Sequence, residues 1–173
     1  MITIERIIIV ASAVITCLLQ MFLAPHVAVG YAVPNFMAAL CLAMAIVRAE
    51  TLGPVLPFVL GLLYDLMSGG PVGAMAFSLT VFSMVASAVF QRANNDTVFM
   101  AVAVLLASVL LVELTYGMFY LLFGYSANFL EALAYRVFPC FVYDAVLALV
   151  IYLVLARFLR REAPLQSEIR QVH

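Results

Sequence analysis

Apolar runs fill almost the whole chain and leave no polar segment large enough to fold as a soluble domain. Of the 173 residues, 68% are hydrophobic and 10% are charged, whereas a soluble domain is typically about 45–50% apolar and about 25% charged. An excess of this size cannot be buried in one small core, but lipid can cover it. The sequence therefore predicts an all-α integral membrane protein. The net charge of −1 gives no basic surface for nucleic acid.

The apolar runs predict a bundle of six transmembrane helices. A helix that crosses a bilayer needs about 20 apolar residues, with a range of about 17–25. The predicted spans are 7–24, 32–47, 52–67, 72–91, 97–123 and 137–159. The second and third are short, so a re-entrant pair buried in protein is an alternative to two full crossings. We expect one six-span domain over residues 1–161 and a short cytoplasmic tail over 162–173.

The arginines predict the orientation of the spans, because basic residues are retained on the cytoplasmic side of a membrane. Six spans place both termini on one side, and that side receives all the arginines but one. The arginines on the side of the termini are Arg6, Arg48, Arg92, Arg157, Arg160, Arg161 and Arg170. The other side receives Arg136 alone. We therefore expect both termini in the cytoplasm and short outer connections, of which 124–135 has room for an interfacial helix.

Three acidic residues lie inside the predicted spans, in the outer half of the membrane: Asp65, Glu113 and Asp144. Arg136 stands at the outer end of the sixth span. Ionisable residues inside a membrane are rare and usually face a bundle interior or a cavity, and Gly117, one turn after Glu113, favours a protein-facing position. Two interpretations stay open. One is an outward-facing polar pocket for a small ligand, a proton or a partner's side chain, and the other is an internal network that fixes helix packing.

Glycines surround Asp65 and predict a close helix contact followed by a tight turn. Gly61 precedes Asp65 by four residues, so the two share one helix face, and small residues mark faces where membrane helices approach closely. Gly69 and Gly73 have the spacing of a helix-dimerisation motif. Gly70 lies between them before a proline, which favours a hairpin between the third and fourth spans.

No catalytic or cofactor-binding pattern is found in the sequence. Cys17, Cys41 and Cys140 lie in apolar surroundings without metal-binding spacing, so we expect buried thiols. Two membrane aspartates, Asp65 and Asp144, would suit an intramembrane protease, but their surroundings match no protease signature. We therefore expect no enzymatic activity, no cofactor and no metal.

The segment from Gly61 to Gly73, GLLYDLMSGGPVG, resembles the signature of the MreD family, the membrane component of the bacterial rod-shape system. Pro34-Asn35, at the start of the second span, stands where the family often has Pro-Asp. The sixth span is also similar, with Pro139 near its start and an arginine-rich end. The resemblance covers nearly the whole chain in length and number of spans, and its specific part is the segment between the third and fourth spans.

The resemblance implies a role in cell elongation and not a reaction. The family works with MreC, with the actin-like filament MreB and with the elongation transglycosylase and transpeptidase. It helps to couple the filament to peptidoglycan synthesis along the side wall, from the bacterial cytoplasmic membrane. Asn35 lacks the charge of the common aspartate, which weakens any role that needs a charge there, whereas Asp65 keeps the family's acid. The candidate residues for helix packing or partner contact are Pro34, Asn35, Gly61, Asp65, Gly69, Gly70 and Gly73.

The MreD family in turn resembles the substrate-binding subunits of energy-coupling-factor vitamin transporters. Those subunits are six-helix membrane proteins with an outward-facing ligand pocket, and the outer acids would suit such a pocket. Vitamin capture is therefore the alternative function. The segment 61–73 favours the MreD family, and the short outer loops offer few residues to cover a ligand.

Overall fold

The computed structural model describes residues 2–28, 32–50, 52–92, 98–125, 130 and 133–159. For residues 2–6, 135 and 159 it describes the backbone alone. These residues form six α-helices, one π-helical turn and no strand, which confirms the predicted all-α six-helix bundle. The elements are α1 (Ile2–Phe22), α2 (Phe36–Val47), α3 (Val55–Ser68), α4 (Ala74–Arg92), α5 (Val98–Leu122), η1 (Leu133–Val137) and α7 (Phe138–Leu159). The predicted tail over 162–173 and residues 126–129, 131 and 132 of the connection 124–135 lie outside the described residues.

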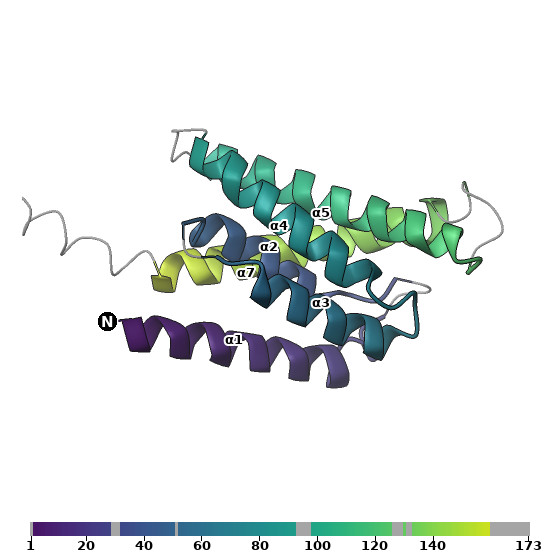
Figure 1. The fold of residues 1–173 in the computed structure, drawn as a ribbon, viewed down its shortest axis with the longest axis horizontal. Helices are drawn as coiled ribbons and strands as arrows, with labels where there is room; N and C mark the ends of the chain where they lie inside the picture. Colours follow the sequence, from purple (N-terminus) through teal and green to yellow (C-terminus); the bar gives the residue numbers. More distant parts are fainter. Residues whose placement is uncertain are drawn as a thin grey trace, which may run out of the picture.

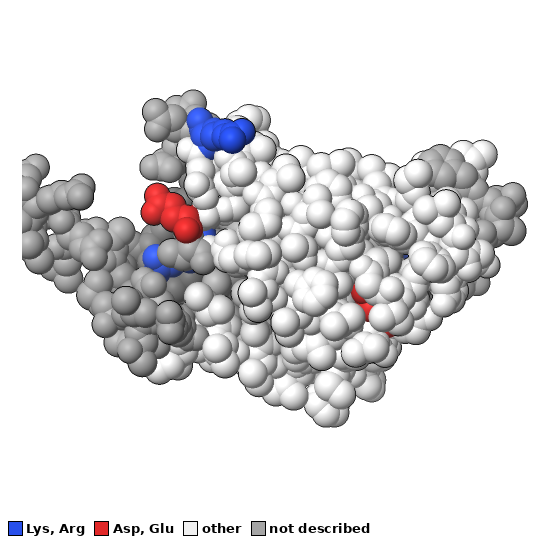
Figure 2. Space-filling model, viewed as in Figure 1, with Lys and Arg blue, Asp and Glu red and all other residues white. Residues whose placement is uncertain are grey.

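The outer surface of the bundle suits lipid. Within the described residues, helices α4, α5 and α7 are long and apolar enough to cross a membrane, whereas the apolar parts of α1, α2 and α3 are shorter. Large apolar side chains point outward, including Val10 on α1, Val85 on α4 and Val146 on α7. Figure 2 shows most of the visible charged side chains toward one end of the molecule and a largely uncharged face over the rest, apart from one acidic patch. The chain is therefore a membrane protein.

Helix α2 lies at the centre of the bundle (Figure 1). Eleven of its 12 residues are buried, and it packs against α1, α3, α4, α5 and α7. With a rise of about 1.5 Å per residue it is about 18 Å long, shorter than the hydrocarbon core of about 30 Å. Its first turn therefore lies inside the protein, where Asn35 is only 1% exposed.

The structure begins α2 later than the predicted start of the span, at Phe36 and not near residue 32. Pro34 disfavours the helical conformation in the residue before it. Asn35 is the N-cap, because its Oδ1 accepts a hydrogen bond of 2.9 Å from the amide of Ala38. A cap of this kind satisfies one of the amide groups that a helix start leaves free.

Helices α3 and α4 form the hairpin that the glycines predict. Helix α3 begins after Pro54, with Pro57 in its first turn, where a missing amide donor costs little. It ends at Ser68, and Gly69 follows as the C-cap in the left-handed conformation, with φ of 67°. Gly73 has φ of 93° directly before α4. Two positive φ angles within five residues reverse the chain direction between the two helices.

The start of α1 and the end of α7 lie at the same end of the bundle (Figure 1). Arg48 follows α2, Arg92 ends α4 and Arg157 is in the last turn of α7, so these arginines lie toward that end. Arg136 lies in η1, which precedes α7 at the opposite end. The described arginines are thus divided between the two ends in the way that the predicted orientation requires.

Candidate functional site

Asp65 binds the start of α4. Its side chain is 1% exposed, and its two oxygens accept hydrogen bonds from three backbone amides. Gly73 donates at 2.9 Å, Met75 at 3.1 Å and Ala76 at 3.2 Å. The first amides of a helix have no partner within the helix and carry the positive end of its dipole, which favours an anionic acceptor. Asp65 therefore joins α3 to the N-terminus of α4.

Gly61 allows this contact to form. It lies one turn before Asp65 on the same face of α3. A Cβ atom added to Gly61 would lie 2.5 Å from Cα and 2.7 Å from the backbone nitrogen of Ala76. Any side chain at this position would separate the two backbones. Gly61 therefore allows α4 to approach α3, and Asp65 then binds the amides at the start of α4.

The turn after Asp65 also contacts α5. A Cβ atom on Gly70 would overlap the hydroxyl group of Tyr116, and that hydroxyl lies 3.4 Å from Oγ of Ser68. The ring of Tyr116 also meets Tyr64 of α3 edge-on, with ring centroids 6.1 Å apart. The α3–α4 turn is therefore held against one aromatic side chain of α5.

The start of α2 is bound by side chains from α1 and α7. Gln20 of α1 donates to the carbonyl of Pro34 at 3.0 Å and accepts from the amide of Phe36 at 2.8 Å. Asp144 of α7 accepts from the amide of Asn35 at 2.8 Å. The backbone around Asn35 therefore has its polar groups satisfied by protein, as a membrane interior requires.

Two further acids of the predicted spans are buried where α5 and α7 pack against each other. Glu113 of α5 is 4% exposed and Asp144 of α7 is 2% exposed. The structure thus places both acids in the interior of the bundle and away from lipid.

A second close approach positions Arg136. Gly117 lies one turn after Glu113, and a Cβ atom added there would lie 2.5 Å from Cγ2 of Val137. The guanidinium carbon of Arg136 lies 4.0 Å from the ring centre of Tyr120 and 4.9 Å from that of Tyr116, within the range of cation–π contacts. Nε of Arg136 is buried and has no hydrogen-bond partner.

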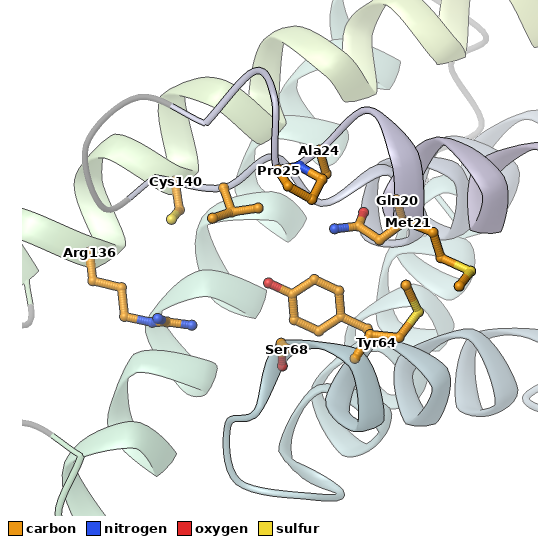
Figure 3. Close-up of a pocket in the computed structure, with 10 residues that line it drawn as sticks. Gln20, Met21, Ala24, Pro25, Tyr64, Ser68, Arg136 and Cys140 are labelled. Carbon is orange, nitrogen blue, oxygen red and sulfur yellow. The ribbon is translucent and has the colours of Figure 1, made fainter.

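A cavity of about 330 Å³ lies beside Arg136 and Tyr64. Figure 3 shows the ring of Tyr64 and the guanidinium group of Arg136 directed into it, with residues from α1 on the opposite wall. Its polar lining comes from Gln20, Tyr64, Ser68 and Arg136, and apolar side chains line the rest. A site of this composition can hold an apolar group together with a hydrogen-bond acceptor or an anion.

The charged residues that the sequence places in the outer half of the membrane make different contacts. Asp144 accepts from the amide of Asn35, and Arg136 contacts the rings of Tyr116 and Tyr120. The oxygens of Asp65 bind backbone amides of the α3–α4 turn and α4. Sequence reasoning did not select Gln20, although an amide in the middle of an apolar span was a signal that could have found it.

These features define a class of protein: a small polytopic membrane protein with buried acidic side chains and a cavity between its helices. Among the described residues, no group of His, Cys, Asp and Glu side chains could hold a metal ion. The family model of the rod shape-determining protein MreD matches residues 1–162. The chain therefore belongs to the MreD family, whose members are shape-determining membrane proteins. No curated protein and no solved structure matches the chain.

We predict that Gly61→Ala destabilises the protein, because the new methyl group pushes the backbone of α4 away from α3. Overpacking of this kind costs about 1–3 kcal/mol of unfolding free energy. Gly53→Ala is the matched control, since a Cβ atom at Gly53 meets nothing within 4 Å. Thermal unfolding of the purified protein in detergent measures the difference, and equal midpoints for the two variants would contradict the close contact.

We also predict that Asp65→Asn destabilises the protein. Asparagine keeps the shape of aspartate but replaces one acceptor oxygen with a donor, which then faces amide donors at the start of α4. Leaving buried amides without an acceptor costs about 1–3 kcal/mol. Glu50→Gln is the control, because Glu50 is exposed. If Asp65→Asn and Glu50→Gln unfolded at the temperature of the wild type, the capping role of Asp65 would be wrong.

Proposed function

We propose that this chain is a non-enzymatic scaffold of the bacterial cell-elongation machinery, which couples MreB and MreC to peptidoglycan synthesis along the side wall. Its membership of the MreD family over residues 1–162 carries the proposal. The described residues support the proposal, because nearly all of them lie in membrane helices or in the short connections between them. Such a chain offers its helix surfaces and its cavity to partners.

We place the protein in the bacterial cytoplasmic membrane with both termini in the cytoplasm. Arg48, Arg92 and Arg157 support this orientation, since they lie toward one end of the bundle and basic residues are retained in the cytoplasm. The end that carries Arg136 and the cavity then faces outward.

We propose MreC as the direct partner of the outward end, because the family resemblance implies that most of MreC lies outside the membrane. The cavity supports this placement. It combines apolar walls with the hydroxyl groups of Tyr64 and Ser68 and with the guanidinium group of Arg136, whose Nε has no hydrogen-bond partner. A segment of MreC at the membrane surface can place an apolar side chain and a hydrogen-bond acceptor there. MreB and the elongation transglycosylase and transpeptidase would be reached through MreC or directly.

A rod-shaped host depleted of its own MreD protein tests this function. We expect the wild-type chain to restore rod shape and lateral wall insertion, and Met21→Trp to fail, because the larger ring fills one edge of the cavity. Phe138→Ala is the control, since Phe138 is 64% exposed and is not a lining residue of this cavity. MreC should co-purify with the wild type and with Phe138→Ala but not with Met21→Trp.

The two parts of the proposal fail in different ways. If depleted cells stay rods with unchanged wall insertion, the scaffold function is wrong. If Met21→Trp restores the rods and still co-purifies with MreC, only the placement of MreC at the cavity is wrong.

Vitamin capture is the second candidate function, and the cavity is the observation that favours it. Its volume of about 330 Å³ lies at the lower end of the range of about 300–1,000 Å³ for small-molecule sites. This function predicts that a vitamin raises the unfolding temperature of the purified protein, and that Met21→Trp abolishes the shift. A thermal-shift screen of water-soluble vitamins without a hit would contradict it.

A further inference from the structure

The cavity beside Arg136 opens toward lipid, which the scaffold function does not require. Met21 of α1 and Met67 of α3 line the cavity, and both are also exposed on the outer surface, at 55% and 42%. Each methionine lies in the last turn of its helix. The cavity therefore opens between the ends of two neighbouring membrane helices, near the level of the lipid headgroups.

We propose that the cavity binds an anionic phospholipid when no partner segment fills it, with the phosphate group on Arg136 and the acyl chains between α1 and α3. This inference goes beyond the scaffold function and does not depend on it. A lipid and a segment of MreC would exclude each other from the cavity, so a partner that enters must displace the lipid.

The polar end of the cavity fits a phosphate group. The guanidinium carbon of Arg136 lies 4.0 Å from the ring centre of Tyr120, and a guanidinium group stacked on a ring keeps its N–H edge free for phosphate. Within the described part of the chain, the buried Nε of Arg136 has no acceptor, although buried donors normally have one. The hydroxyl groups of Tyr64 and Ser68 line the same cavity and can donate as well.

Apolar stripes lead from the cavity along the two helices. Met21 and Met67 each continue a row of exposed apolar side chains on the same helix face, at spacings of three or four residues. The rows contain Val14 and Leu18 on α1 and Val59 and Leu63 on α3. Acyl chains can follow these rows into the membrane while the phosphate group stays in the cavity.

Charge and apolar surface together select the class of lipid. The apolar walls favour a lipid over free phosphate, because a chain that lies against them removes apolar surface from water. The guanidinium charge of Arg136 favours a headgroup that brings no cation of its own. Basic pockets between membrane helices are a known form of anionic lipid site.

Calorimetric titration of the purified protein in detergent tests the site with three probes: dioctanoyl phosphatidylglycerol, dioctanoylglycerol and inorganic phosphate. We expect the phosphatidylglycerol to bind at least about tenfold more tightly than either of the others, because only this probe makes both the charge-assisted and the apolar contacts. Equal binding of dioctanoylglycerol would overturn the phosphate contact. Inorganic phosphate that bound as tightly as the lipid would identify a free-anion site and overturn the lipid.

Two variants test where the lipid binds. Arg136→Gln should weaken binding of the phosphatidylglycerol about tenfold or more, whereas Arg157→Gln, at an exposed arginine toward the other end of the bundle, should bind like the wild type. Met21→Trp should also lose the lipid, because the larger ring fills the opening. Equal affinities of the two arginine variants would overturn the proposal.

A second outcome keeps the test decisive if Arg136→Gln does not fold. Met21→Trp that bound the lipid like the wild type would also overturn the proposal, and the comparison of the three probes needs no variant. Neither MreC nor living cells enter these titrations. A failure of the lipid site is therefore separate from a failure of the scaffold function.

Discussion

The backbone at the start of α2 must find its hydrogen-bond partners inside the protein, and much of the structure depends on this constraint. Helix α2 is too short to reach both membrane surfaces, so the first free amides lie among apolar helices with no access to water. Asn35 satisfies one from within the chain segment itself, while Gln20 of α1 and Asp144 of α7 satisfy others. Three helices are therefore fixed around one point by polar contacts, and the surrounding apolar packing is arranged about it.

Backbone amides at the start of α4 are likewise bound by a side chain from a neighbouring helix. Asp65 provides the acceptor, and Gly61 allows the two backbones to approach. Two of the acids in the membrane thus share a purpose, since each compensates amides at a helix start. An acid that would be costly in lipid becomes stabilising where it meets the positive end of a helix.

Gln20 extends the first of these contacts toward the cavity. It binds the backbone at the start of α2 and also lines the cavity. A group that contacts Gln20 in the cavity therefore acts on a hydrogen-bonded contact that ends at the central helix. In the proposed scaffold, this gives a partner at the outward end a physical route to helix packing.

The sequence by itself determined the six helices, the α3–α4 hairpin and the protein-facing position of the acids, because these follow from hydrophobicity and from helical spacing of four residues, as for Gly61 and Asp65. Only the tertiary structure decided the partner of each acid. Asp65 binds amides up to 11 residues away, whereas Asp144 binds an amide 109 residues away that has no side-chain signature in the sequence. Gln20 was missed for the same reason, since its partners are backbone groups at and just before the start of α2. A polar side chain in a membrane span indicates a need for a partner, but which backbone group meets that need depends on how the helices pack.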